Sequence, residues 1–357
     1  MELVNTSPVP VDYAIIGNLP DDSRAVIFTA KATFRIEDNG QVKLERETPF
    51  PLLKEDQSTE MGLLPSDNLP RLDPAFEVML LGKAYAPFGQ STTEMRVALS
   101  VGDVHHEIDV IGDRIWQGEG ESASIAPPEA FESMPLVWER AFGGSQQVLI
   151  DKEAVLDVSW PMNSAGKGFD HISQAREIGV AFNCPADYPQ FDATRALPNL
   201  ETPDLRVKSW TDLPLPVCWA PVPQSSGLIF ERFERSCEKR GEDHVTLGAP
   251  EMHHRAHPDW VIETPHAGAM VRLEGASSQG LLEFRLPELR VVADLQDGDR
   301  VQALELFPRS LVLLPEEKRF YITFRCVTGF DYRENEKRVA RIKLLKGWCP
   351  DNMEESP

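Results

Sequence analysis

The chain has 357 residues, with 36 Lys and Arg against 57 Asp and Glu, which gives a formal net charge of -21 at pH 7. A field of that sign repels nucleic acid and anionic lipid surfaces, so the composition argues against both as partners. It fits either solubility alone or a protein partner with a basic surface.

The first predicted element is a strand over 24–36, in which apolar residues alternate with Thr29, Lys31, Thr33 and Arg35. Asn39-Gly40 follows, and Asn-Gly between alternating runs is the strongest short hairpin signal. Further along we expect a proline-punctuated loop over 47–75 and strands over 77–84, 95–101 and 104–111. These elements predict an antiparallel β unit over 1–118, arranged as a meander.

Regular patterning weakens after this unit and predicts a loop-rich middle over 119–240. A short helix over 129–142 would be interrupted by Pro135. The better helix candidate is 228–240, because serines precede it, Gly241 follows it, and an i,i+4 Glu–Arg pair lies within it.

Alternating patterns return in a C-terminal β unit over 241–349. We expect strands over 269–273, 281–286, 301–307 and 320–327, whereas 334–346 fits either a helix or a strand. The acidic tail 350–357 is expected to be mobile. The predicted fold class is therefore mainly β, with antiparallel β-sandwich-like units, a loop-rich middle and few short helices.

The five cysteines are widely spaced and include no C-x-x-C pair, which argues against a disulfide framework and a zinc site and favours a reducing cytoplasm. The first ten residues, MELVNTSPVP, lack the basic and apolar regions of a signal peptide. No apolar run approaches the roughly 18 residues of a membrane span. We therefore expect a cytoplasmic protein that does not contact the membrane.

A histidine cluster at His253, His254 and His257 is the one candidate metal site. His253 and His257 would share a helix face, as metal ligands often do. However, no Glu lies between them in the H-E-x-x-H manner, and Pro258 follows at once, so we favour a polar loop and expect no bound metal. The rival hypothesis is a metal-dependent hydrolase that uses these histidines with a nearby carboxylate.

Other catalytic signatures are weak or missing. Ala165-Gly166-Lys167-Gly168 resembles the end of a phosphate loop, but that loop needs a glycine where Pro161 stands and a hydroxyl where Gly168 stands. The sequence also lacks a G-x-S-x-G elbow, and no pair among its many carboxylates is singled out by context. We expect no catalytic residue, no cofactor and no enzymatic activity.

Aromatic and charged residues stand together at two places in the middle of the chain. We favour a structural interpretation, in which each place is a tight turn held by packed rings and a buried ion pair. In this interpretation Arg140, which stands between Trp138 and Phe142, has an acidic partner. The alternative is a partner-binding surface, since aromatic and Arg side chains are enriched at binding hot spots. The candidate anchors are Arg114, Trp116, Trp138, Glu139, Arg140 and Phe142.

Five short segments in order carry a resemblance to a known family: GKAYAPFG, VIGDRIW, MPLVWERAFGG, MNSAGKGF and ALPNLETPD. The series resembles a bacterial family of domains of unknown function that are encoded beside type VI secretion effectors, and the resemblance extends over about 12–346. The sequence departs from that family at Asn163-Ser164, where the family usually has Asn-Pro.

The resemblance implies a cytoplasmic adaptor or chaperone. Such a protein holds a secreted effector and helps to dock it on the secretion spike, often through a small spike-tip domain. It implies no cofactor and no catalysis. The expected partner is therefore an effector, possibly basic, whose identity the sequence does not give. A structural component of the secretion apparatus is a further alternative.

Overall fold

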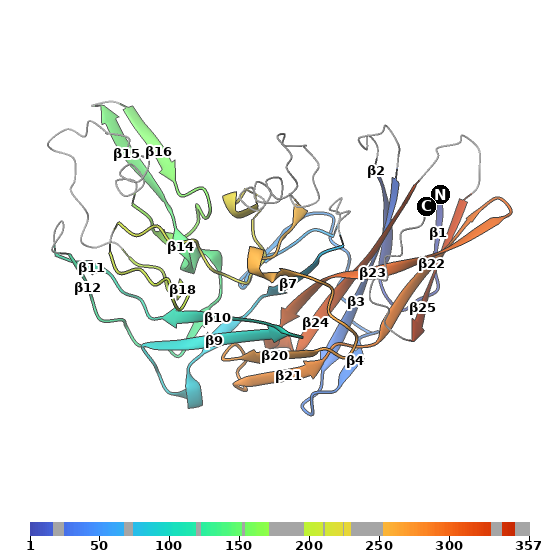
Figure 1. The fold of residues 1–357 in the computed structure, drawn as a ribbon, viewed down its shortest axis with the longest axis horizontal. Helices are drawn as coiled ribbons and strands as arrows, with labels where there is room; N and C mark the ends of the chain where they lie inside the picture. Colours follow the sequence, from blue (N-terminus) through green and yellow to red (C-terminus); the bar gives the residue numbers. More distant parts are fainter. Residues whose placement is uncertain are drawn as a thin grey trace.

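The computed structural model describes residues 1–16, 25–67, 74–118, 123–151, 154–170, 196–209, 211–223, 225–229, 253–329 and 338–346. These residues form a mainly β fold with one sheet of ten strands, one of five strands and several two-stranded sheets (Figure 1). The prediction of a mainly β fold is confirmed. Within the described part of the chain, no helix combines the length and apolarity needed to cross a membrane.

The ten-stranded sheet is nearly closed and lies on the right of Figure 1. Its main path runs in the order β1 (Glu2–Asn5), β25 (Arg338–Lys346), β22 (Leu289–Asp297), β23 (Arg300–Leu314), β24 (Arg319–Gly329), β3 (Ala25–Ile36) and β2 (Val11–Ile16). Three further strands pair with β3, β23 and β7 respectively: β4 (Val42–Leu44), β7 (Phe76–Leu80) and β19 (Val261–Ile262).

The second large sheet has the order β18 (Leu200–Glu201), β10 (Val104–Ile111), β9 (Glu94–Val101), β20 (Met270–Glu274) and β21 (Leu281–Arg285). The two-stranded sheets are β5 (Gln57–Thr59) with β6 (Gly62–Leu64), β8 (Lys83–Tyr85) with β13 (Ser133–Pro135), β11 (Trp116–Gln117) with β12 (Ser124–Ile125), β14 (Phe142–Gly143) with β17 (Lys167–Gly168), and β15 (Ser145–Asp151) with β16 (Ala154–Ser159). Short 3-10 turns include η1 (Pro87–Gly89), η3 (Trp138–Arg140), η5 (Pro258–Trp260) and η6 (Pro315–Glu317).

Both hairpins predicted near the N-terminus form. β3 and β4 pair across Gly40, whose φ of 77° suits the turn, and β9 and β10 pair across Gly102. However, the meander is wrong, because the two hairpins belong to different sheets and β7 pairs in parallel with β23. Both large sheets thus combine strands from 1–118 with strands from 241–349. The predicted unit boundaries themselves remain predictions.

Several predicted elements differ in extent. The 47–75 loop contains the β5–β6 hairpin, and the predicted 301–307 strand continues to Leu314. No helix forms over 129–142, where Pro135 ends β13 and only the single turn η3 follows. The region 338–346 is a strand, which settles one of the two alternatives. Residues 227–229 are helical, and the remainder of the predicted 228–240 helix and the predicted mobile tail 350–357 lie outside the described residues.

The main core lies between the two large sheets. Phe284 of β21 stacks on Phe320 of β24 at a centroid distance of 4.6 Å, and Phe320 stacks in turn on Phe34 at 5.1 Å. Trp219 and Trp260 are buried in the same core and meet edge to face at 5.8 Å. Each of the two facing surfaces buries the apolar set of its alternating strands, as expected for a sandwich interface.

Candidate functional site

The five short segments that carry the resemblance are joined to one another in space. β8–β13 joins 82–89 to 134–144, and β14–β17 joins 134–144 to 162–169. A bridge between Ile115 and Ala196 links 110–116 with 196–204. We refer to these five segments, 82–89, 110–116, 134–144, 162–169 and 196–204, as the junction; in Figure 1 its strands β14 and β18 lie above the left end of β10.

Asp113 is the charged centre of the junction. Its Oδ1 accepts hydrogen bonds from Arg140 Nη1 at 2.9 Å, Asn199 Nδ2 at 3.0 Å and Lys167 Nζ at 3.1 Å. Burial alone would raise the pKa of Asp113, but the bonds from Asn199 and Lys167 outweigh it and hold that pKa below its usual range. Three segments are therefore tied to one ionised carboxylate.

The buried ion pair of the junction involves Arg114 rather than Arg140. Arg114 Nη2 lies 2.7 Å from Glu201 Oε2, and the two side chains are 8% and 2% exposed. Burial raises the pKa of Glu201 even though Arg114 acts in the opposite direction. Arg140 has the acidic partner that the sequence suggested, Asp113, but its side chain is 30% exposed. The ion pair predicted at Arg140 therefore forms, but it is partly exposed rather than buried, since Asp113 is 54% exposed.

The aromatic anchors of the junction point inward. Trp116, Trp138 and Phe142 are all buried. Trp138 Nε1 donates to the backbone oxygens of Ala220 at 3.1 Å and Pro221 at 3.0 Å, so its polar group is satisfied inside. Rings packed in this way stabilise the junction and do not face a partner. Of the predicted anchors, Glu139 is exposed.

Close backbone contacts explain two glycines of the junction. A Cβ on Gly143 would lie 2.0 Å from the carbonyl oxygen of Asn163, and one on Gly112 would lie 1.8 Å from that of Glu129. Asn163 is itself buried and donates from Nδ2 to the carbonyl oxygens of Trp138 and Phe142, at 2.8 and 3.0 Å. At both glycines the two backbones approach so closely that any side chain would clash, and this fixes the neighbouring segments relative to each other.

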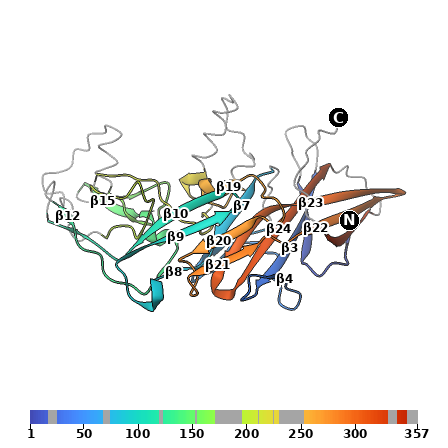
Figure 2. The same ribbon diagram turned by 60° about the horizontal axis from the view of Figure 1, so that its bottom comes forward.

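The exposed aromatic residue of the junction is one that the sequence analysis did not single out. Phe88 lies in η1, between β8 and β9, and is 99% exposed. Its backbone has φ 57° and ψ 21°, in the left-handed region. Figure 2 shows this turn at the lower edge of the molecule. The sequence feature that indicates this exposed residue is Pro-Phe-Gly, in which a large apolar residue stands at a turn.

Two histidines of the cluster are buried. The predicted loop forms over 254–257, but it packs inside the protein, with His254 and His257 both buried. No helix places His253 and His257 on one face, because the single turn η5 begins only after His257. His257 Nδ1 accepts from the backbone N–H of Asp259 at 3.3 Å. Among the described residues, no group of three or more His, Cys, Asp or Glu side chains is placed to hold a metal ion.

Ser100, His105 and Glu107 form a line on the outer face of the five-stranded sheet, in the order of a catalytic triad. Ser100 Oγ lies 2.8 Å from His105 Nδ1, and His105 Nε2 lies 3.4 Å from Glu107 Oε1. Ser100 and His105 are directly paired across β9 and β10, and Arg96 Nη1 also donates to Glu107 at 2.9 Å. Cross-strand pairing on an exposed face accounts for this line without catalysis.

The ten-stranded sheet also carries a buried polar row on the face turned away from the five-stranded sheet. Lys31 of β3, Thr323 of β24, Ser310 of β23 and Glu77 of β7 are direct neighbours across the four strands. All four are buried. The segment 51–67 covers this row: Pro51 O accepts from Lys31 Nζ at 3.0 Å.

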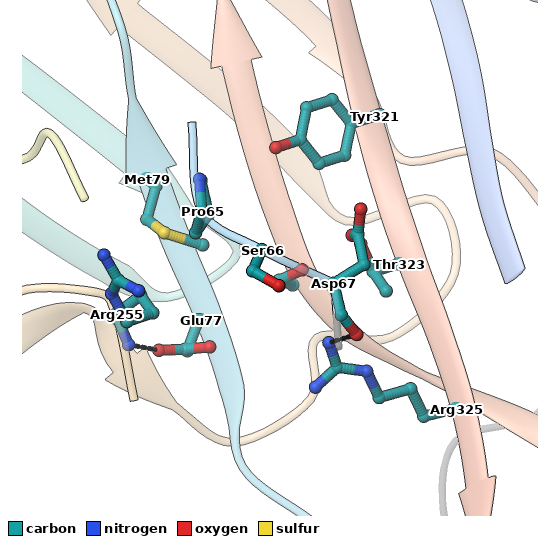
Figure 3. Close-up of a pocket in the computed structure, with 10 residues that line it drawn as sticks. Pro65, Ser66, Asp67, Glu77, Met79, Arg255, Tyr321, Thr323 and Arg325 are labelled. Carbon is teal, nitrogen blue, oxygen red and sulfur yellow. Dashed lines mark hydrogen bonds between the residues drawn. The ribbon is translucent and has the colours of Figure 1, made fainter. Parts of the chain in front are cut away.

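Charged partners from the covering segment and from 253–257 complete the row. Lys31 Nζ lies 2.5 Å from Asp67 Oδ2, and the Asp67 carbonyl accepts from Arg325 Nη2 at 2.8 Å. Arg255 binds Asp56 with both terminal nitrogens, at 3.0 and 2.9 Å, and its backbone N–H donates to Glu77. Figure 3 shows the Arg255–Glu77 and Asp67–Arg325 groups on opposite sides of a small cavity.

That cavity has a volume of about 20 Å³ and holds about one water-sized molecule. The buried hydroxyl of Tyr321 lines it and has no hydrogen-bond partner within the protein. Burial lowers the pKa of Lys31, although Asp67 acts to raise it, and burial raises that of Tyr321. The volume is far below the roughly 300–1,000 Å³ of small-molecule sites, so the row is a structural feature.

Residues 21–325 match the profile of a family described as an uncharacterized protein conserved in bacteria, DUF2169. No curated protein and no solved structure matches the chain. The match covers most of the chain, including all five segments of the junction. The protein therefore belongs to the bacterial family DUF2169.

Proposed function

We propose that the protein is a cytoplasmic adaptor of type VI secretion, which binds a cognate effector and promotes its loading on the secretion spike. The resemblance of the five segments supports this class of function. The physical observation that carries it is the net charge of -21, which suits a partner with a basic surface.

The charge would act mainly on encounter. An acidic adaptor attracts a basic effector over about 8 Å at physiological ionic strength, which raises the association rate. Apolar contacts then set how long the complex lasts. Binding also stabilises a marginal effector segment by mass action, in proportion to how far the adaptor concentration exceeds the dissociation constant.

Deletion of the gene in its native host tests the proposal. The effector encoded beside it should no longer be secreted, while the secretion tube and other effectors are exported normally. The purified protein should form a stoichiometric complex with that effector. Normal secretion of the effector in the deletion strain, or two purified proteins that do not associate, would exclude the adaptor function.

Two alternatives have their own tests. A structural component of the apparatus would remain with the assembled particle after purification, whereas an adaptor would not. A metal-dependent hydrolase would contain about one zinc per chain by elemental analysis, and a triple His253/His254/His257→Ala variant would lose that metal. We expect no stoichiometric metal, because two of these histidines pack inside the core.

A further inference from the structure

We propose that Phe88 is the anchor with which this protein binds its partner, and that it enters an apolar pocket with a basic rim on a protein surface. This inference deepens the proposed adaptor function and depends on it for the identity of the partner. It assigns the contact to the turn η1 rather than to the anchors Trp116, Trp138 and Phe142, whose rings are buried.

The exposure of Phe88 goes beyond that of other apolar side chains. Single exposed apolar residues are normal on a protein surface. Val301 and Leu205, the next most exposed large ones among the described residues, are 65% and 61% exposed, against 99% for Phe88. Burial of a phenylalanine side chain removes a large apolar surface from water, which is favourable. A partner that covers Phe88 would gain that favourable free energy, which the isolated fold does not use.

The backbone supplies an independent observation. At φ 57°, Phe88 lies in a region that L-residues with large side chains rarely adopt. A glycine would adopt this conformation without steric cost, and the following residue, Gly89, does so at φ 65°. The turn therefore holds an aromatic side chain in water at a position where glycine would suit the isolated fold better. Strain of this kind is concentrated at functional sites.

The turn is also held rigidly. The backbone N–H of Ala86 donates to Glu132 O at 2.8 Å, and Thr92 exchanges two backbone hydrogen bonds with Phe131, at 3.0 and 2.9 Å. Both ends of the loop are thus clamped to the same neighbouring segment, which also forms β13. Because the backbone of the turn is already positioned, little backbone entropy remains to be lost on binding.

Charges near the turn indicate the chemistry of the partner. Glu129 and Glu132 lie on the clamping segment and Glu94 begins β9, and all three are exposed. Glu94 is paired with Arg206 at 3.0 Å, so the three glutamates outnumber this arginine. Together with the overall charge of -21, this favours a basic rim and disfavours a second copy of the same chain.

The test uses the purified full chain and the purified product of the neighbouring effector gene, with binding followed in real time. Phe88→Ala should weaken the complex by at least about tenfold, mainly through faster dissociation, as expected for a hot spot. Phe88→Trp should retain most of the affinity, and Val301→Ala is the matched control for loss of an exposed apolar side chain. The double variant Glu129→Lys/Glu132→Lys should slow association.

Thermal melting separates anchoring from folding, since Phe88→Ala should melt no lower than wild type. If wild type binds the effector and the affinity of Phe88→Ala lies within about twofold of the wild-type affinity, Phe88 is not the anchor. The adaptor function would remain intact in that case. If wild type does not bind the effector, the adaptor function fails. In that case a photo-crosslinker placed at position 88 in host cells identifies the protein that Phe88 contacts. A crosslinked basic protein whose purified form binds wild type but not Phe88→Ala supports the anchor. Crosslinking to a second copy of this chain, or no crosslinked product, overturns it.

Discussion

Removal of the Asp67 carboxylate should strongly destabilise the fold. Asp67 is 8% exposed and pairs with Lys31, which is 1% exposed. Its Oδ2 also accepts from the backbone N–H of Leu53 at 2.7 Å, so it ties the covering segment to the sheet. In Asp67→Ala the ammonium of Lys31 stays buried. It keeps one hydrogen bond, to Pro51 O, and lies 4.5 Å from the ring of Tyr321. Loss of one member of a buried pair costs about 3–5 kcal/mol.

Urea unfolding followed by tryptophan fluorescence measures this loss, with three comparisons. Adding Lys31→Met to Asp67→Ala removes the isolated charge and should recover most of the stability. Asp38→Ala breaks the exposed Lys318–Asp38 pair on the same sheet and should change little. A loss below about 1 kcal/mol for Asp67→Ala, the size typical of a surface pair, would refute the reasoning.

The same variant should show a defined pH dependence. Burial already lowers the pKa of Lys31, and without Asp67 it falls further. The native state then binds fewer protons than the unfolded state, so stability rises with pH. The deficit against wild type is fully present below the folded pKa of Lys31 in the variant, and it shrinks as the pH rises towards the folded pKa of Lys31 in wild type. A deficit that widens from pH 7 to pH 9 would contradict this assignment.

Three further predictions concern the junction and the core. Arg114→Ala should lower the free energy of unfolding by about 3–5 kcal/mol. Arg140→Ala should lower it less, because the Arg140 side chain is partly exposed. The same urea titration measures both losses. Gly112→Ala should abolish soluble expression or sharply lower the melting temperature, whereas Gly329→Ala, with no neighbour near its added Cβ, should melt like wild type. Burial raises the pKa of Cys218 to about 12, so peptide mapping after maleimide treatment at pH 8 should find this thiol unlabelled in the native protein and labelled in urea.

Much of the local structure followed from the sequence. Alternation located β3, β9, β10 and β24, and Asn39-Gly40 located a hairpin. The alternating pattern does not indicate which distant strands of the chain pair with one another. The parallel contact of β7 with β23 joins residues more than 200 positions apart, and nothing in either local pattern indicates it.

The polar face of β3 shows a second limit. Lys31 and Thr33 alternate with apolar residues, a pattern that usually means one face in water. Here both faces are buried, because a distant loop covers the polar face and supplies Asp67. A single sequence gives the residue types of such an ion pair but not the partner.

The sequence singles out the five segments of the junction, but neither their contacts in space nor the roles of their residues follow from it. Arg114 and Arg140 have similar neighbours in the sequence, and only the fold places Glu201 in the core beside one and Asp113 near the surface beside the other. Phe88 was overlooked because an aromatic beside Pro and Gly is normally packed. Its exposure depends on where the turn lies relative to the sheets.

The most direct test of the adaptor function is the association rate constant with the neighbouring effector, measured at two ionic strengths. The account predicts a specific complex whose association slows markedly as salt rises, while its dissociation rate changes little. No complex, or an association rate that is independent of salt, would contradict the claim that this acidic protein captures a basic effector.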